Sequence, residues 1–280
     1  MINVAVLGFG TVGSGVVEII NGKEFAKKVG KEINVKKILD IRTFDDSPFG
    51  NLVTSDFDSI LDDKEISIVV ETMGGTNPAY DFTKRSLMAG KSVVTSNKEL
   101  VAEKGDILLA LAKEKDADLV LATDPDADRL GVYVKDSKSG EYICLTGNMS
   151  GSFLADYEIG QKLALEGKLP EDGYMVKTIV TTNLVDAIAK YYGIKVVECL
   201  TGFKWIGREI LKSEQSGEGT YLFGFEESYG CLIGTHARDK DGIVASMALC
   251  EAAAYYKKRG MTLWDAMINM YEKYGYYKDD

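Results

Sequence analysis

The chain has 280 residues, 45% of them hydrophobic and 27% charged, and its formal net charge is -10. This composition is typical of a soluble globular protein with room for about two domains. The acidic charge argues against nucleic acid or an anionic membrane as a partner. Four cysteines without a Cys-x-x-Cys spacing indicate reduced thiols and a cytoplasmic location. Neither a signal peptide nor an apolar run of membrane-spanning length is visible.

The chain begins with a predicted strand, Ile2–Leu7, that runs directly into a glycine-rich turn and a helix predicted over Thr11–Ile20. A Gly-x-Gly-x-x-Gly turn in this context is typical of a dinucleotide-binding site. Gly8 permits the tight turn, Gly10 lets a pyrophosphate approach the backbone, and Gly13 lets helix and strand pack closely. The free N–H groups of the helix would hold the phosphates. A glycine turn without a ligand is the simpler alternative.

A second strand is predicted over Val35–Ile41, and the residues at its end should select the ribose. Asp40 could hydrogen-bond the 2′-hydroxyl of NAD, whereas Arg42 could pair with the 2′-phosphate of NADP. Because side chains alternate along a strand, we expect one of the two to point away, and the sequence leaves open which. The next elements expected along the chain are a strand over Ile66–Glu71, a helix over Ala79–Ala89 and a strand over Ser92–Thr95.

Three motifs in this half, residues 8–15, 71–75 and 94–105, resemble the nucleotide-binding domain of homoserine dehydrogenase. The resemblance covers residues 1 to about 113 and implies a Rossmann fold that binds NAD(P). It further implies that Thr72, Gly74 and Lys98 lie beside the nicotinamide, although Lys98 alone would more simply be a surface or helix-cap lysine. The residues that it implies for wrapping the dinucleotide are Gly8, Phe9, Gly10, Thr11, Val12 and Gly13.

The middle of the chain is expected to hold a metal. A helix predicted over Gly105–Lys115 leads to an apolar strand, Leu119–Ala122, that we expect to be buried. Three carboxylates follow at alternate positions, Asp124, Asp126 and Asp128. They should repel one another unless a hard cation such as Mg²⁺ or Ca²⁺ neutralises them. An EF-hand is excluded, because Arg129 and Lys135 stand at its sixth and twelfth positions. A Mg²⁺ loop or a solvated acidic turn remains.

The rest of the chain alternates predicted strands and helices. Strands are expected over Met175–Val180, Lys195–Cys199 and Thr220–Gly224, and helices over Asn183–Tyr192, Ile206–Lys212, Ile243–Arg259 and Thr262–Tyr274. Residues 213–219 should form a polar loop. In the helix that starts at Ile243, core positions are expected at Met247, Leu249, Cys250 and Ala254.

Five ordered motifs in the second half resemble phosphoglucomutase, of the α-D-phosphohexomutase superfamily. They are residues 124–131, 145–148, 202–207, 224–230 and 238–242, and the resemblance covers residues from about 112 to 280. It implies that the three aspartates hold Mg²⁺ and that Glu226 and Ser228 hold the sugar ring. It places four basic residues near the sugar phosphate, namely Arg129, Lys204, Arg238 and Lys240.

Several of these residues also have simpler interpretations. Glu226, Glu227 and Ser228, between glycines on a flexible turn, could grip sugar hydroxyls through charge-assisted hydrogen bonds or form a solvated β-turn. Lys204 could lie over its aromatic neighbour. His236, the single histidine, is as compatible with a surface position as with a site. Lys98, Lys204, Lys240 and His236 are therefore only candidates for catalysis.

The sequence therefore predicts an α/β chain in three parts. These are a Rossmann-type parallel sheet in residues 1–116, part of a phosphohexomutase metal-loop domain in residues 117–172, and an α/β/α phosphohexomutase sugar-binding domain in residues 173–280. Neither the catalytic domain of homoserine dehydrogenase nor the Thr-x-Ser-His-Asn-Pro phosphoserine loop of the mutases is visible.

We therefore expect a hybrid that binds NAD(P), Mg²⁺ and a sugar phosphate without complete catalysis of its own. The alternatives are a phosphoglucomutase-like phosphotransferase and a homoserine dehydrogenase, each completed by another chain. Both fragments should expose apolar surface or an unpaired sheet edge, which favours self-association.

Overall fold

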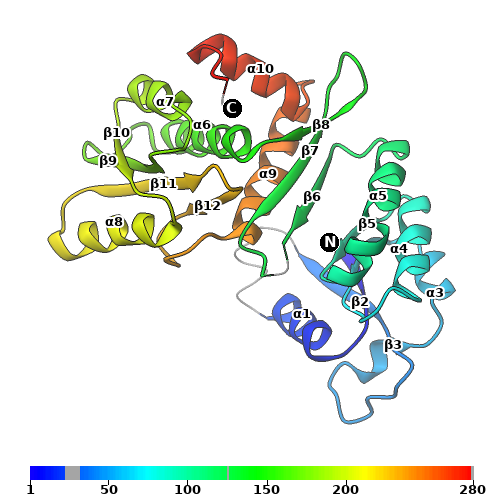
Figure 1. The fold of residues 1–280 in the computed structure, drawn as a ribbon. Helices are drawn as coiled ribbons and strands as arrows, with labels where there is room; N and C mark the ends of the chain where they lie inside the picture. Colours follow the sequence, from blue (N-terminus) through cyan, green and yellow to red (C-terminus); the bar gives the residue numbers. More distant parts are fainter. Residues whose placement is uncertain (23–31, 125, 279–280) are drawn as a thin grey trace. The chain divides into compact units, whose positions relative to one another are not determined.

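The computed structural model describes residues 1–22, 32–124 and 126–278. The chain divides into two compact units, Met1–Asp116 and Ala117–Asp280, which we call unit 1 and unit 2 (Figure 1). Across the described residues, no helix is both long enough and apolar enough to cross a lipid bilayer.

Unit 1 is built on a five-stranded parallel sheet with the order β3-β2-β1-β4-β5. Its strands are β1 Ile2–Leu7, β2 Ile33–Leu39, β3 Val53–Thr54, β4 Ile66–Glu71 and β5 Ser92–Thr95. Its helices are α1 Thr11–Asn21, α3 Asp58–Leu61, α4 Ala79–Met88 and α5 Lys98–Glu114, with a 3-10 turn η1 at Gly50–Leu52. This order confirms the Rossmann-type sheet. Successive strands are added on one side of β1 up to β3 and on the other side from β4 onward, and sheets of this type bind ligands at that switch point.

The sheet of unit 1 has a separate core on each face, because side chains alternate along β1. Val4 and Val6 lie in one core with Val17 of α1. Ala5 and Leu7 lie in the other core, on the face covered by α3 and α4. Burial on both faces explains why β1 is apolar without a break from Val4 to Leu7.

Helix α5 is longer than predicted and packs sparsely. It begins at Lys98, where Asn97 caps it by accepting a hydrogen bond from the N–H of Leu100 at 3.1 Å. Leu100 is the single residue of α5 that is buried, and Val101 is 39% exposed. The neighbouring strand β5 ends the sheet and leaves Val94 56% exposed. Unit 1 therefore has exposed apolar side chains beside an open sheet edge.

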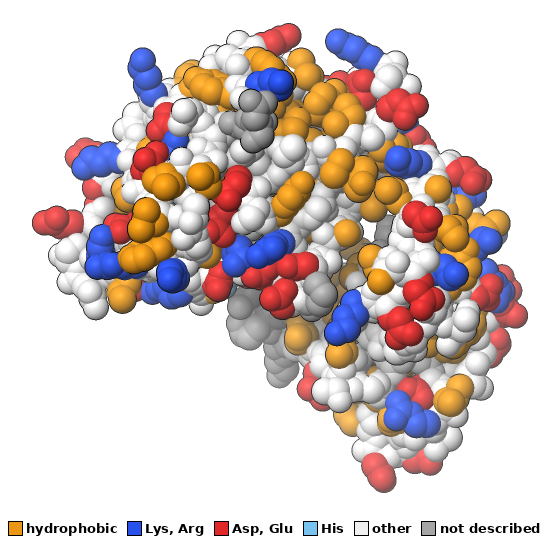
Figure 2. Space-filling view, viewed as in Figure 1, with side chains coloured by type: hydrophobic (Ala, Val, Ile, Leu, Met, Phe, Trp, Pro, Cys, Tyr) orange, Lys and Arg blue, Asp and Glu red, His pale blue; other side chains and the backbone are white. Residues whose placement is uncertain are grey.

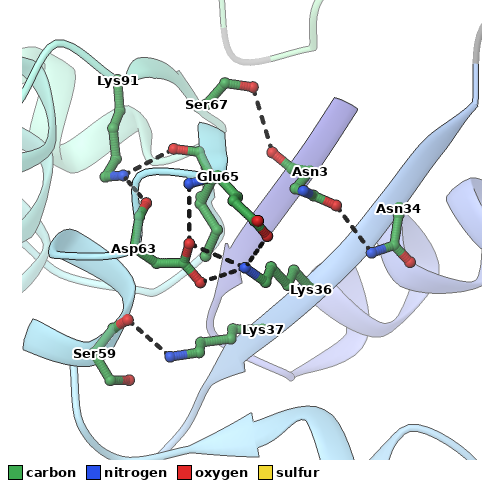
Figure 3. A network of polar contacts seen from close by, with 10 residues as sticks. Asn3, Asn34, Lys36, Lys37, Ser59, Asp63, Glu65, Ser67 and Lys91 are labelled. Carbon is green, nitrogen blue, oxygen red and sulfur yellow. Dashed lines mark hydrogen bonds and ion pairs between the residues drawn. The ribbon is translucent and has the colours of Figure 1, made fainter. Parts of the chain in front are cut away.

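A polar network joins β2, the turn before β4 and the residue before β5 (Figure 3). Lys36 pairs with Asp63 at 2.7 Å and with Glu65 at 2.6 Å. Lys91 is 7% exposed and donates to the carbonyl oxygens of Asp63 and Ile66, each at 2.8 Å. Burial lowers the pKa of Lys91. The two ammonium groups converge on the turn before β4 (Figure 3) and fix where that strand begins.

We expect Lys91→Met to lower the free energy of unfolding of unit 1 by about 1–3 kcal/mol, because two carbonyl oxygens lose their buried donor. Urea unfolding should show a lower midpoint with an unchanged slope. Lys64→Met, at an exposed position in the same turn, is the matched control and should change the midpoint little. Equal losses in the two variants would contradict the role assigned to Lys91.

Unit 2 contains two sheets. One has the order β10-β9-β11-β12 and is parallel except for β12, and the other is antiparallel with the order β6-β7-β8. The strands are β6 Leu119–Thr123, β7 Leu130–Lys135, β8 Tyr142–Leu145, β9 Gly173–Thr178, β10 Lys195–Cys199, β11 Thr220–Glu226 and β12 Gly230–Ile233. The helices are α6 Gly147–Glu166, α7 Leu184–Tyr192, α8 Phe203–Ser216, α9 Gly242–Lys257 and α10 Leu263–Tyr274.

One large core holds both sheets of unit 2 together. It includes Val132 of β7, Ile159 of α6, Met175 of β9 and Leu249 of α9, each at most 1% exposed. A second core lies between the four-stranded sheet and α8, which Figure 1 shows on the opposite side of the sheet from α6 and α7. The large core draws on residues before and after position 172. The domain boundary expected near residue 172 stays a prediction.

The sequence missed several elements of unit 2. It predicted neither the antiparallel strands β7, β8 and β12 nor the 20-residue helix α6. Helix α8 continues to Ser216, through much of the segment expected to be a loop. In α9 only Leu249 of the four expected core positions is buried, whereas Met247, Cys250 and Ala254 are exposed. The helix turns a different stripe inward, consisting of Ala245, Ala248, Leu249 and Ala252.

Strand β6 is not the buried strand that the sequence predicted. Its residues are half-buried or exposed, because it lies at an edge and, within the described part of the chain, pairs with β7 alone. It does not join β1, since the sheet of unit 1 ends at β5. The two halves of the chain therefore have separate sheets.

Candidate functional site

The glycine turn of unit 1 follows β1 and lies against the residues that follow β4. Gly8 has a φ of +95°, in the region that favours glycine. A Cβ at Gly13 would lie 1.9 Å from the carbonyl oxygen of Gly8 and 2.8 Å from Thr72 Oγ1. A Cβ at Gly10 would meet nothing within 4 Å. The fold itself therefore requires Gly8 and Gly13, whereas Gly10 leaves the backbone open to a ligand.

Thr72 joins the ends of the two central strands. Its N–H donates to the carbonyl of Leu7 at 2.9 Å, and its hydroxyl lies 3.0 Å from the carbonyl oxygens of Leu7 and Gly8. Helix α1 starts beside this junction without a side-chain cap and without an acidic residue in its first turn. Uncapped N–H groups at a helix start attract anions, so this end of α1 is suited to a pyrophosphate. Thr11 and Val12, in that first turn, are exposed.

Asp40 and Arg42 converge, so the expectation that one of them points away was wrong. Residues two apart along an extended chain lie on the same face, so alternation does not separate Asp40 from Arg42 just beyond the end of β2 at Leu39. Arg42 Nε and Nη2 donate to the carboxylate of Asp40 at 3.0 and 2.9 Å, and the N–H of Phe9 donates to the same carboxylate at 2.9 Å. The hydrogen bonds from Arg42 outweigh partial burial and hold the pKa of Asp40 well below its usual value. The two residues expected to select the ribose thus form a carboxylate–guanidinium pair that is hydrogen-bonded to the glycine turn.

Glu71, which the sequence did not single out, connects the end of β4 to the start of α5. Its side chain is fully buried, and its carboxylate accepts hydrogen bonds from the N–H of Met73 at 2.7 Å and from the Thr95 hydroxyl. Asn97 Nδ2 lies 3.5 Å from the same carboxylate. Burial raises the pKa of Glu71 despite these hydrogen bonds. The residues that the sequence assigned to the nicotinamide side lie on the two segments that Glu71 connects, and they are Thr72, Gly74 and Lys98.

The three aspartates of unit 2 lie together in the hairpin between β6 and β7. Each offers a carboxylate oxygen, and these oxygens all lie within 4.8 Å of one another. Asp128 Oδ1 is buried, and the described residues give it no hydrogen-bond partner. Arg129 Nε lies 3.8 Å from it, beyond hydrogen-bond distance. Clustered oxygens, one of them buried and unsatisfied, fit a hard divalent cation such as Mg²⁺.

Two other motifs of unit 2 contact this aspartate loop. Lys240 Nζ lies 2.9 Å from Asp128 Oδ2. The N–H of Gly242 donates to the carbonyl of Ala127 at 3.0 Å, and the carbonyl of Tyr229 accepts from the N–H that begins β7 at 3.1 Å. The structure therefore brings together the acidic loop, residues 226–230 and residues 238–242, which are far apart in sequence.

Glu226 belongs to β11 and not to a flexible turn, and it is 6% exposed. Its Oε1 accepts a hydrogen bond from the N–H of Gly202 at 2.9 Å, at the start of α8, and Ser228 Oγ lies 3.5 Å from its Oε2. Burial raises the pKa of Glu226. Glu227 turns elsewhere and accepts from the hydroxyl of Thr178 at 3.1 Å. Glu226 and Ser228 thus lie together, whereas Glu227 supports the sheet.

Three other candidates make local contacts. Lys204 Nζ lies 5.4 Å from the ring centre of Trp205, in agreement with the simpler of the two interpretations of this lysine. Arg238 pairs with Glu214 of α8 and donates to two nearby carbonyl groups. His236 Nε2 lies 2.8 Å from Asp241 Oδ2, and the other oxygen of Asp241 caps α9. In the described structure, Arg129 and Lys240 are the basic candidates that form ion pairs with the aspartates.

Comparison with protein families gives two matches, one mainly in unit 1 and one within unit 2. Residues 8–122 match the family described as homoserine dehydrogenase, NAD binding domain. Residues 146–274 match phosphoglucomutase/phosphomannomutase, alpha/beta/alpha domain III. The chain is thus similar to segments of two families, one in each half. The predicted resemblances are confirmed, and strand β6 falls inside the first match although it pairs with β7 in unit 2.

Individual relatives cover part of the chain. A human glucose 1,6-bisphosphate synthase is 37% identical over 174 residues, which are 61% of this chain and 28% of that protein. A Staphylococcus aureus phosphoglucomutase is 36% identical over 174 residues, 62% of this chain and 30% of that protein. The chain thus spans less than a third of the length of these relatives. A crystal structure of Staphylococcus aureus homoserine dehydrogenase is 27% identical, covers 69% of this chain and 51% of its own, and has a TM-score of 0.39.

Proposed function

We propose that unit 1 binds NAD(P) and that unit 2 binds Mg²⁺ together with a sugar phosphate. The single observation that most strongly supports the metal site of unit 2 is the buried, unsatisfied oxygen of Asp128 within a cluster of carboxylates. No Thr-x-Ser-His-Asn-Pro sequence occurs in the 280 residues, so phosphoryl transfer by these residues alone would lack its nucleophile. The chain is therefore a hybrid with binding functions and without turnover of its own.

In unit 2, the oxygens of Asp124, Asp126 and Asp128 would hold Mg²⁺. When bound, the ion supplies charge neutralisation for a phosphoryl group. Glu226 and Ser228 would accept and donate hydrogen bonds to sugar hydroxyls, and their contact at 3.5 Å supports that pairing. The basic side chains nearest to the acidic loop in the ion-pair network, Arg129 and Lys240, would hold the phosphate.

In unit 1, the glycine turn and the uncapped start of α1 would hold the pyrophosphate, with Asp40 at the adenosine ribose. A bound dinucleotide supplies a hydride donor or acceptor, and the chain supplies its orientation. The open backbone at Gly10 supports this assignment. On the face drawn in Figure 2, acidic and basic side chains are interspersed with hydrophobic ones, which suits small ligands better than a nucleic acid. Self-association and a cytoplasmic location stay predictions.

Titration by calorimetry and fluorescence tests both halves of the proposal. The purified chain should quench or enhance NADH fluorescence on binding, and Mg²⁺ should raise its melting temperature. Assays of phosphoglucomutase and of homoserine oxidation should show no turnover above background. Mutase turnover by the isolated chain would favour the second candidate, a phosphohexomutase-like enzyme, which the 36–37% identity of unit 2 to such proteins supports.

The pair of Asp40 and Arg42 leads to a prediction about cofactor preference. Asp40→Ala should shift the ratio of dissociation constants toward NADPH by about tenfold, because it removes a carboxylate that repels a 2′-phosphate and frees the Arg42 guanidinium. Parallel titrations with NADH and NADPH measure the ratio. Asp46→Ala, at an exposed position in the same unit, is the control and should leave the ratio unchanged. An unaltered ratio in Asp40→Ala would show that this pair does not contact the ribose.

A further inference from the structure

We infer that Glu71 is the residue that positions the nicotinamide side of the dinucleotide site, by fixing the turn after β4 against the start of α5. This inference rests on the proposed binding of NAD(P) by unit 1. It concerns a residue that touches the loops around the ligand and not the ligand itself, so Glu71 is a positioning residue.

The first link runs from Glu71 to its own turn. The carboxylate accepts the N–H of Met73 at 2.7 Å, so it bends back over the turn that contains Thr72. Thr72 is itself bonded to the end of β1, with its hydroxyl 3.0 Å from the carbonyl oxygen of Gly8. The turn after β4 is therefore held on one side by the glycine turn and on the other by a buried carboxylate.

The second link runs from Glu71 to the start of α5. The Thr95 hydroxyl donates to Glu71, and the N–H of Asn97 donates to Thr95 Oγ1 at 3.0 Å. Asn97 Nδ2 donates to the carbonyl of Gly75 at 2.7 Å, and its Oδ1 accepts the N–H of Leu100 at 3.1 Å. Asn97 thus caps α5 and holds the far end of the same turn. The position of Lys98, the first residue of α5, is therefore set by this cap.

Burying this carboxylate costs folding free energy that a neutral side chain in the same place would not cost. Glu71 is 0% exposed, and its contacts in the described part of the chain are with neutral groups. Desolvation without an ion pair destabilises the charged form, as the direction of its pKa shift shows. A carboxylate is, however, a group that accepts from a backbone N–H, a hydroxyl and an amide at once. Glutamine has one carbonyl oxygen and cannot satisfy all three donors.

The test compares NADH with ADP-ribose, which lacks the nicotinamide. In Glu71→Gln the affinity for NADH should fall by about tenfold while the affinity for ADP-ribose changes by less than about twofold, because the glycine turn is untouched. Glu65→Gln, an exposed glutamate of the same unit, is the matched control and should bind both ligands as the wild type does. Circular dichroism and thermal melting check that each variant is folded.

Other outcomes separate the inference from the function on which it rests. Equal losses for both ligands, or no loss for NADH, would overturn the positioning role while leaving dinucleotide binding established. Failure of the wild type to bind either ligand would overturn the proposed function and the inference together. If Glu71→Gln does not fold, Thr95→Val removes one donor from the same carboxylate and should show the same selective loss for NADH, with a smaller size. A folded Thr95→Val protein that binds both ligands normally would also overturn it.

Discussion

Gly13→Val should abolish dinucleotide binding and lower the free energy of unfolding of unit 1 by about 3 kcal/mol. Any Cβ at this position would lie 1.9 Å from the carbonyl oxygen of Gly8, which is backbone and cannot turn aside. Helix α1 would have to move away from the end of β1. The same movement would break the contact between Thr72 and the glycine turn, so binding and stability should fall together. Calorimetric NADH titration and urea unfolding measure the two effects.

Two other glycines of this segment serve as controls. Gly15→Ala, where a Cβ would meet nothing within 4 Å, should raise the stability of α1 by about 0.5–1 kcal/mol and leave binding intact. Gly10→Val should leave stability nearly unchanged and still prevent binding, because the new side chain occupies the space through which a pyrophosphate approaches. If Gly10→Val binds NADH normally, the glycine turn is structural and the dinucleotide assignment is wrong.

Asp126→Asn should weaken Mg²⁺ binding by at least about tenfold and slightly stabilise the protein measured without Mg²⁺. The two effects have opposite signs because this carboxylate is both a metal ligand and one of three like charges within 4.8 Å. Asp126 is exposed, so its replacement costs no packing. Melting temperatures with and without millimolar Mg²⁺ give both quantities, and calorimetry gives the dissociation constant.

The comparison with Asp128→Asn tests the assignment further. That variant also loses the ion pair with Lys240 at 2.9 Å, so it should lower both Mg²⁺ affinity and stability. Glu218→Gln, an exposed carboxylate elsewhere in unit 2, is the control for loss of negative charge. The metal assignment fails if Mg²⁺ raises the melting temperature of Asp126→Asn as much as that of the control.

Much of unit 1 could be predicted because its signals are local. An apolar strand, a glycine turn and a helix follow one another within 20 residues, and the structure places all three where the pattern indicates. The acidic loop was visible for the same reason, since its three carboxylates lie within five consecutive positions. Asp40 and Arg42 were recognised too, but the expectation that they point apart was mistaken, because residues two apart in an extended chain share a face.

Helix α6 could not be predicted because it is buried on more than one side. Ser150, Gly151 and Ser152 are all buried in it, so polar and small residues stand where an amphipathic pattern would require apolar ones. Gly151 is there because a Cβ would lie 2.0 Å from the Phe225 ring. Such a requirement comes from β11, far along the chain. Packing partners of this kind leave no periodic signal in the helix itself.

The contacts of Glu71 and the pairing of β6 were missed for a similar reason. Glu71 looks like the polar end of an apolar strand, and only the folded positions of Thr95 and Asn97 reveal its contacts. Strand β6 follows a helix as it would in a parallel sheet. Its antiparallel partner β7 decides otherwise, with Leu121 opposite Val132. Pairing choices between strands depend on the whole chain and not on the strand alone.

The ion pair between Lys240 and Asp128 has a consequence for how the acidic loop would handle a metal. The lysine ammonium lies 2.9 Å from the carboxylate and would neutralise part of its charge whenever the proposed ion is not bound. A divalent ion that bound here would replace the ammonium group at the carboxylate. The gain in electrostatic energy would be only the difference between the two interactions. A loop whose charge is neutralised by its own lysine should keep its conformation without the ion and should release a bound ion readily. That behaviour suits a cation that travels with a phosphorylated ligand better than one that is retained for the life of the protein.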